Sequence, residues 1–187
     1  MTVTSWQTFN TKMEEVKSAV LAWGEDIETS VNRGKSLIFV GKTGTGKTHL
    51  GTAIVMGALR KGFVAKIVDC SLLLSEIYET YGKDDAGRAK GEAAKLIRAY
   101  IDLDVLVIDE IGRSPISSHG ADRLFEIIDG RYKQCRPTIA ISNLPLVGKD
   151  IQNASLRTVL GDAAISRLSD GGQCFAFDWE DFRLRTK

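Results

Sequence analysis

Short, mainly apolar runs alternate along the chain with longer segments in which apolar residues recur at helical spacing. Such runs are typical of strands buried in a parallel sheet, and they occupy residues 36–40, 63–68, 105–108, 138–141 and 174–177. The segments between them predict amphipathic helices at residues 10–23, 47–60, 71–81, 89–100 and 155–168, with one more through 124–128. Because strands and helices alternate, the pattern predicts an α/β fold with a five-stranded parallel sheet.

The length and composition of the chain fit one globular domain. It has 187 residues, of which 43% are hydrophobic and 26% are charged. The 25 Lys and Arg residues nearly balance the 24 Asp and Glu residues, so any binding of a polyanion such as DNA requires a local basic patch. We therefore expect residues 1–187 to form a single domain, with residues 1–35 as an N-terminal helix and linker packed on it.

The cysteines and the start of the chain bear on where the protein acts. Cys70, Cys135 and Cys174 are far apart and form no C-x-x-C pair, which argues against a disulfide framework or a zinc knuckle. The first residues do not have the pattern of a signal peptide, and no apolar run approaches the ~18 residues that a membrane-spanning helix needs. These features predict a cytoplasmic protein that does not bind a membrane.

The segment after the first predicted strand, Gly41-Lys-Thr-Gly-Thr-Gly-Lys-Thr48, matches the G-x-x-x-x-G-K-[ST] motif in full. A strand before it and a helix after it are the context in which this motif forms a phosphate-binding loop. Glycines allow backbone N–H groups to surround a phosphate, and Lys47 reaches the β- and γ-phosphates. The alternative is a glycine-rich turn that binds nothing, which leaves this context unexplained. The residues predicted to bind the nucleotide are Gly41, Thr43, Gly44, Thr45, Gly46, Lys47, Thr48 and His49.

Two carboxylates end the strand predicted at 105–108. Asp109 and Glu110 follow four apolar residues, and the ends of parallel strands meet at the edge of the sheet where the phosphate loop lies. Asp109 and the hydroxyl of Thr48 are the predicted Mg²⁺ ligands, and Glu110 is predicted to orient the water that attacks the γ-phosphate. Taken alone, two solvated charges at a strand end would explain the pair equally well, but the complete phosphate loop favours catalysis.

Two further polar residues are candidates for the catalytic site. Asn143 follows the strand at 138–141 and can hydrogen-bond the γ-phosphate or the water, although Asn is also common in turns. Arg167 lies late in the chain and can reach the γ-phosphate of a neighbouring subunit as an arginine finger. Spacing alone favours an ordinary surface arginine at this position.

These motifs, in this order, resemble those of the AAA+ ATPases, and more closely those of the DnaC/DnaI-type helicase loaders and the IstB transposition helper ATPases. The resemblance runs from about Trp6 to Arg185 and rests on GKTGTGKTHL, VLVIDEIG, RPTIAISNL and FDWEDFRLR. It implies a three-layer αβα P-loop NTPase without a C-terminal lid domain. Its functional residues would be Lys47 and Thr48 (Walker A), Asp109 and Glu110 (Walker B), Asn143 (sensor I) and Arg167 (arginine finger).

The resemblance also implies a DNA-binding surface on helices inserted between the second and third strands. Residues 71–100 correspond to this insertion, and an aromatic side chain beside basic residues suits binding of single-stranded DNA without sequence preference. In the alternative, the charges only solvate an exposed face. The candidate DNA contacts are Tyr81, Lys83, Arg88 and Ser118.

The function that the resemblance implies is an ATPase with the cofactors ATP and Mg²⁺. It would form a homo-oligomer through Arg167 when ATP is bound, bind single-stranded DNA, and load or remodel a DnaB-type replicative helicase. An IstB-like transposition helper acting on duplex DNA is the close alternative. A P-loop kinase of small molecules, or a switch that binds ATP without hydrolysing it, would share the phosphate loop.

Two features depart from the pattern of the loaders. Only about 35 residues precede the first predicted strand, where loaders carry a domain that grips the helicase. Gly161-Asp162-Ala163 stands where the family has Gly-Glu-Arg, so one of two expected arginines is missing. The helicase is therefore the partner for which the sequence gives the least support.

Overall fold

A computed structural model describes residues 2–80, 89–148 and 154–184 of the chain. Five parallel strands form one sheet in the order β2-β3-β4-β1-β5. The strands are β1 (Leu37–Gly41), β2 (Ala65–Asp69), β3 (Val105–Ile111), β4 (Thr138–Ser142) and β5 (Gln173–Phe177). The predicted α/β fold with a five-stranded parallel sheet is thus confirmed, although β2 begins at Ala65 and not at residue 63. Phe63 still belongs to the turn after the preceding helix, since its N–H donates to the carbonyl of Ala58.

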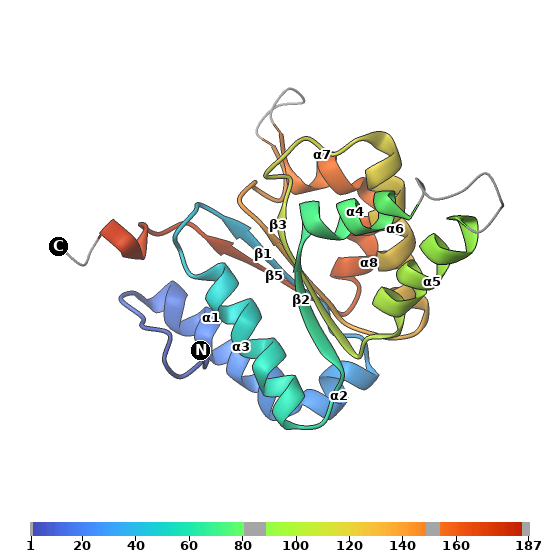
Figure 1. The fold of residues 1–187 in the computed structure, drawn as a ribbon. Coiled ribbons are helices and arrows are strands. Elements are labelled where there is room, and N and C mark those ends of the chain that lie inside the picture. The colour runs from blue at the N-terminus through green and yellow to red at the C-terminus, as the bar shows by residue number, and fades with distance from the viewer. Residues whose placement is uncertain (1, 81–88, 149–153, 185–187) are drawn as a thin grey trace.

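Helices cover both faces of the sheet (Figure 1). The two faces of the sheet pack into two separate cores; in β1, for example, Leu37 and Phe39 face one core and Ile38 and Val40 the other. The helices of the first face are α1 (Thr11–Glu25), α2 (Ile27–Asn32) and α3 (Lys47–Arg60). Those of the second are α4 (Cys70–Glu79), α5 (Ala89–Asp102), α6 (Ser118–Lys133), α7 (Leu156–Leu160) and α8 (Asp162–Ser169). The short helix α2 had no counterpart among the predicted elements.

The helix expected at residues 155–168 is instead two helices, α7 and α8. Gly161 separates them with φ 81° and ψ 159°, a conformation that cannot continue a right-handed helix and that is open mainly to glycine. Ser155 begins α7 with a capping box to Thr158. The break lets Leu160 and Ala164 both enter the second core.

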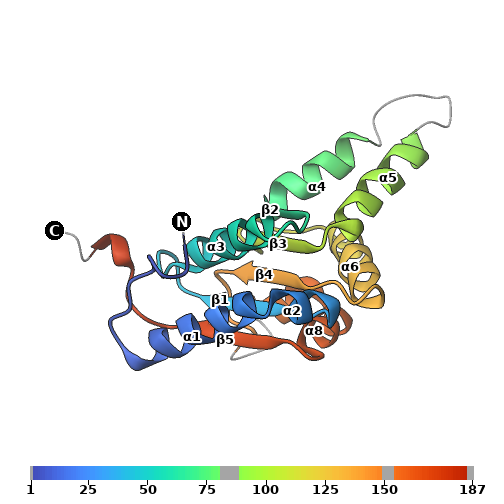
Figure 2. The ribbon, with the colours of Figure 1, turned by 90° about the horizontal axis from the view of Figure 1, so that it is seen from below.

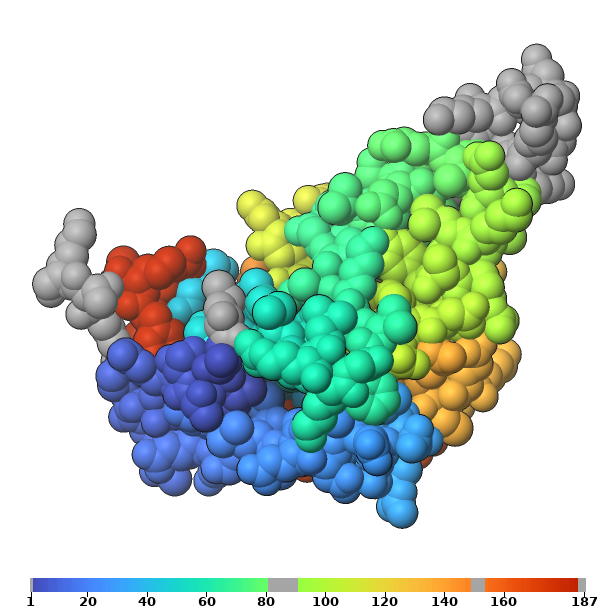
Figure 3. Space-filling model, turned by 60° about the horizontal axis from the view of Figure 1, so that its bottom comes forward, coloured from blue at the N-terminus to red at the C-terminus, as the bar shows by residue number. Residues whose placement is uncertain are grey.

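Two parts of the fold stand out from the layered body. Helices α4 and α5 project from it as a pair (Figures 2 and 3). At the opposite side of the molecule, the first residues of the chain and the 3₁₀ helix η1 (Phe182–Leu184) lie next to each other, in dark blue and red in Figure 3. Within the described residues, no helix has the length and apolar character that crossing a membrane requires.

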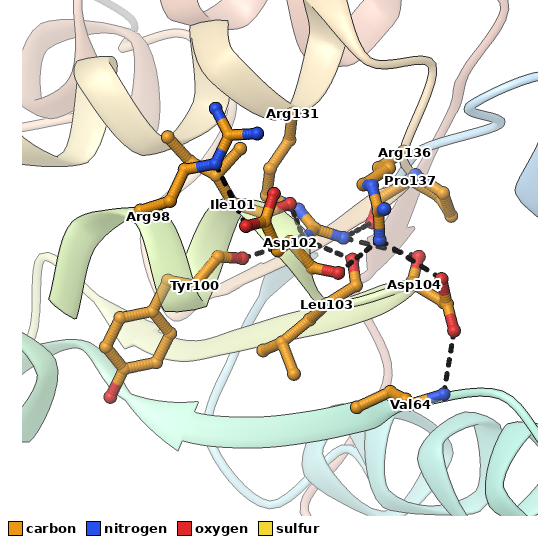
Figure 4. Close-up of polar contacts among 10 residues, drawn as sticks. All are labelled: Val64, Arg98, Tyr100, Ile101, Asp102, Leu103, Asp104, Arg131, Arg136 and Pro137. Carbon is orange, nitrogen blue, oxygen red and sulfur yellow. Dashed lines mark hydrogen bonds and ion pairs between the residues drawn. The ribbon is translucent and has the colours of Figure 1, made fainter. Parts of the chain in front are cut away.

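An arginine is buried where the second helical layer meets the sheet. Arg131 of α6 is 0% exposed, and its Nε donates to the hydroxyl of Thr138 at 3.0 Å. Its terminal nitrogens donate to main-chain carbonyls from the end of α5 to the start of β3 and before β4 (Figure 4), those of Tyr100, Ile101, Leu103, Asp104 and Pro137. Burial lowers the pKa of Arg131 to about 9, which leaves the guanidinium charged at neutral pH. One side chain therefore fixes the end of α6 relative to the starts of β3 and β4.

Candidate nucleotide-binding site

A cavity of about 580 Å³ lies at the edge of the sheet where the strands end. Three elements predicted to meet there do so: the phosphate loop after β1, the end of β3 and the residue that follows β4. Residues from both ends of the chain complete the wall. The lining residues are Thr43, Gly44, Thr45, Gly46, Lys47, Thr48, His49, Asp109, Glu110 and Asn143, with Ser5, Trp6, Gln7, Phe182 and Arg183.

The phosphate loop is held by the C-terminal segment of the chain. The N–H of Lys42 donates to the carbonyl of Phe177, and the indole Nε1 of Trp179 donates to the carbonyl of Thr45 at 3.0 Å. Gly41, the last residue of β1, has φ 130°, and a Cβ there would lie 2.3 Å from the carbonyl oxygen of Phe177. A side chain at residue 41 would therefore push β5 away from the loop.

Lys47 lies beneath this loop and is buried, with 5% of the residue exposed to solvent. Its Nζ donates to the carbonyls of Gly41 and Lys42, each at 2.6 Å. Burial lowers the pKa of Lys47 to about 8, and the charge of Asp109 opposes this shift. The ammonium is consequently protonated at neutral pH, and it places a positive charge at the base of the loop.

The end of β3 is irregular in a way that sets its two carboxylates. The pairing of β3 with β4 shifts register between Ile108 and Ile111, and Glu110 has φ 57°, which is rare for a residue with a side chain. Asp109 is 7% exposed, and its Oδ1 accepts the N–H of Glu110 at 2.7 Å. The bulge brings both carboxylates to the same cavity, whereas a regular strand would point successive side chains to opposite faces.

The donors in this cavity fit a Mg²⁺ ion. Asp109 presents a carboxylate with one oxygen free of the Glu110 N–H, and Thr48 supplies a hydroxyl at the start of α3. Mg²⁺ in nucleotide sites is held by one or two such oxygens, and phosphates and water complete its shell. Thr48 and Asp109 are therefore the residues that would hold the ion.

Two charged residues beside Glu110 were missed by the sequence reasoning. Arg113 forms an ion pair with the carboxylate of Glu110. Asp69 ends β2 opposite Asp109. Burial raises the pKa of Asp69, but the hydrogen bonds that its carboxylate accepts from the amides of Ser71 and Leu72 outweigh burial and lower it. The position of Asp69 at the end of a strand could have marked it, because strands of one parallel sheet end at the same edge.

Arg167 lies far from this cavity, at the opposite edge of the sheet. Its guanidinium pairs with Asp129 of α6, donates to the carbonyl of Ala163 at 3.2 Å and lies 5.0 Å from the ring centroid of Phe125. It lines a second cavity of about 410 Å³ with Arg33. Among the described residues that line the nucleotide cavity, Arg167 is absent.

The remaining candidate residues are placed only in part. Tyr81, Lys83 and Arg88 lie outside the described residues. Ser118 is exposed and begins α6, one residue after the helix cap Ser117, whose hydroxyl lies 3.2 Å from that of Tyr78 in α4. His49 lines the nucleotide cavity, and its Nε2 lies 3.0 Å from the carbonyl oxygen of Thr2.

Comparison with protein families and curated relatives gives a consistent result. Residues 15–187 match the family model described as "IstB-like ATP binding protein". A replicative helicase loader DnaC of Buchnera aphidicola is 30% identical over 182 residues, which are 97% of this chain and 70% of the loader. A putative ATP-binding protein of insertion sequence IS5376 from Geobacillus stearothermophilus is 28% identical over 84% of this chain and 59% of its own length.

Solved structures agree on the fold. A crystal structure of the DnaC helicase loader superposes with a TM-score of 0.76 at 23% identity, over 94% of this chain and 95% of that chain. The replication initiator DnaA bound to AMPPCP and single-stranded DNA superposes with a TM-score of 0.73 at 18% identity, over 96% of this chain and 50% of its own. At these identities the likeness concerns the fold, which is that of AAA+ domains.

Proposed function

The chain belongs to the IstB-like ATP-binding family, and from this premise we propose that it is a Mg²⁺-dependent ATPase of DNA replication that loads or remodels a replicative helicase in the cytoplasm. The observation that carries the proposal is the cavity in which Lys47, Asp109 and Glu110 converge on the phosphate loop. In this proposal, residues 1–187 act as one AAA+ domain.

Each side chain of the cavity has a distinct part in the proposed hydrolysis. Lys47 and the loop amides bind the β- and γ-phosphates, while Thr48 and Asp109 would hold Mg²⁺, which neutralises phosphate charge when it is bound. Glu110 orients the attacking water and accepts its proton, and Asn143 bonds the γ-phosphate or the water. A kinase of small molecules has less support, because a carboxylate directly after Asp109 suits water as the nucleophile.

The helicase is proposed as the partner because loaders named DnaC match nearly the whole chain. Single-stranded DNA is proposed as the surface on which subunits line up, with Tyr81, Lys83, Arg88 and Ser118 as its contacts. The similarity to the IS5376 protein supports a second candidate function, that of a transposition helper that assembles on duplex DNA. The two candidate functions differ in the macromolecule that the chain binds, a replicative helicase in the first and duplex DNA in the second.

A binding experiment separates them. The immobilised DnaB-type helicase of the same source is expected to retain the chain in the presence of ATP, and Lys47→Ala is expected to reduce this retention because that variant cannot hold ATP. Retention measured on a gel or by biolayer interferometry supports the loader. No retention on the helicase, together with ATP-dependent assembly on duplex DNA, would contradict it in favour of the transposition helper.

Arg167 is proposed to act on ATP bound by a neighbouring subunit. Arg167→Ala is expected to keep nucleotide binding and to lower the ATPase rate by about 10³-fold or more, the size of an arginine-finger effect. Mixing it with Lys47→Ala should restore part of the rate, because the second variant supplies the guanidinium and the first supplies an intact pocket. Steady-state phosphate release measures both.

The matched control for this prediction is Arg157→Ala. Arg157 lies in the neighbouring helix α7 and pairs with the exposed Asp162, so its loss should leave the ATPase rate nearly unchanged. If no ratio of the two variants recovers turnover, Arg167 does not act between subunits, and the ATP-bridged oligomer loses its main support.

A further inference from the structure

The three tryptophans of the chain differ in what their indole N–H groups contact. Nε1 of Trp23 donates to the carbonyl of Lys35 at 2.7 Å, and Nε1 of Trp179 donates to the carbonyl of Thr45 at 3.0 Å. Trp6 is also buried, at 3% exposed, but its Nε1 has no hydrogen-bond partner in the described part of the chain. A buried N–H without an acceptor is costly and uncommon, so its position calls for an explanation.

The N–H of Trp6 faces the phosphate loop. A Cβ built on Gly46 would lie 2.2 Å from Nε1 and farther from the flanking ring carbons, at 3.1 and 3.2 Å, so the edge that carries the N–H is the one nearest to Gly46. Gly46 is the N-cap residue of α3, and Trp6 lines the nucleotide cavity. Only glycine fits at residue 46 beside this ring.

The ring of Trp6 is fixed in this place before any ligand binds. Its backbone carbonyl accepts the Nζ of Lys17 in α1 at 2.6 Å. Its indole packs against Phe177, Trp179 and Phe182 with ring centroids 6.3, 5.9 and 6.3 Å away. The donor is therefore preorganised, and binding an acceptor would cost little side-chain entropy.

The surroundings favour an anionic acceptor. The start of α3 directs free backbone N–H groups and a positive partial charge into the cavity, and the ammonium of Lys47 lies in the same loop. The other ring donor nearby is engaged, since Nε2 of His49 lies within hydrogen-bond distance of Thr2 and Ser5. An oxygen held at the N-terminus of α3 would lie within the field of these charges and beside Gly46, the residue that the indole N–H faces.

Resting on the nucleotide-binding function proposed above, we propose that the indole N–H of Trp6 donates a hydrogen bond to a polyphosphate oxygen of the bound nucleotide. Trp6 is then a ligand-binding residue that the N-terminal segment contributes to the phosphate loop. The contact also couples nucleotide binding to docking of residues 2–9 on the body of the domain, because the ring reaches the loop only from that segment.

Trp6→Phe tests the contact, since it keeps an aromatic ring and removes the donor. Without nucleotide, the melting temperature is expected to change little, because removal of an unpaired buried N–H offsets the packing lost around the smaller ring. The affinities for MgATP and for tripolyphosphate, measured by calorimetry, are expected to fall about ten- to hundred-fold, the loss of a hydrogen bond to a charged acceptor. The affinity for adenosine should not change.

Trp23→Phe is the matched control. It removes an indole N–H that already has an acceptor outside the cavity, so it should lower the melting temperature and leave the nucleotide affinity unchanged. In ¹⁵N-tryptophan-labelled wild-type protein, the indole resonance of Trp6 should move downfield on addition of tripolyphosphate, and that of Trp23 should not. This measurement does not depend on how any variant folds.

The outcomes separate failure of the inference from failure of the proposed function. Wild-type protein that binds neither ATP nor tripolyphosphate would remove the nucleotide-binding function itself. Wild-type affinity in Trp6→Phe, or an indole resonance that stays in place, would overturn the role of Trp6 while leaving that function intact. A loss confined to adenosine binding would also overturn the polyphosphate contact, since it would assign the N–H to the nucleoside.

Discussion

Glu110→Gln is expected to bind ATP with nearly the affinity of the wild type and to hydrolyse it about 10²- to 10⁴-fold more slowly, the range that a positioned general base contributes. The amide keeps the shape of the side chain but cannot accept the proton of the attacking water. Lys47 and the loop amides, which hold the phosphates, are unaffected by the change. Calorimetry with MgATP and single-turnover hydrolysis measure the two quantities separately.

The ion pair of Glu110 with Arg113 makes a control necessary, because the substitution also removes that pair. Arg113→Gln breaks the same pair and keeps the carboxylate, so it should retain most of the turnover. Glu126→Gln removes an exposed carboxylate paired with Arg123 in α6 and should change neither binding nor turnover. Wild-type turnover in Glu110→Gln would end the assignment of Glu110 as the residue that activates water.

The sequence predicted the helices and strands whose apolar residues follow a single regular pattern. The central strands β1, β3 and β4 are buried on both faces, so their apolar runs are visible without knowledge of their neighbours. The break at Gly161 was missed because a helical pattern continues through it. Glycine inside a helical pattern is tolerated often enough that only the observed φ of 81° identifies the turn.

The candidate site was predictable where a motif encodes a local loop, as at Lys47 and Thr48, and where a strand ends, as at Asp109. The residues that the N-terminal and C-terminal segments contribute to the cavity could not be predicted. Helices α1 and α2 and strand β1 lie between Trp6 and the phosphate loop in the chain. No pattern in the sequence indicates that the ring of Trp6 packs against Phe182. Such contacts between segments far apart in the chain arise from tertiary packing, for which a single sequence has no periodic signal.

Arg131 shows the same limit for a charged residue. In the sequence it occupies the last turn of an amphipathic helix, where arginine is usually exposed and close to the helix C-terminus. Among the described residues it is the largest fully buried side chain, because the turns around it direct carbonyls inward and only a donor with several N–H groups can serve them all.

Arg131→Met is therefore expected to destabilise the protein by about 3–5 kcal/mol, the size of effect seen when one partner of a buried charged network is removed. Methionine has a similar length, so the loss comes mainly from the hydrogen bonds and not from a cavity. Each carbonyl left without a donor or water costs about 1–3 kcal/mol, and several of the five are buried. The midpoint of urea unfolding, with its slope, measures the change.

Arg136→Met is the matched control five residues further along the chain. Arg136 pairs with Asp104 at 3.1 Å, but its side chain is 28% exposed, so water can replace its contacts and the loss should stay near 1 kcal/mol. Both variants remove a guanidinium that contacts the turn before β3 (Figure 4). The difference between their losses of stability therefore isolates the effect of burial. If Arg131→Met unfolds within about 1 kcal/mol of the wild type, its carbonyl partners are satisfied in another way, and the junction of α6, β3 and β4 does not depend on this side chain.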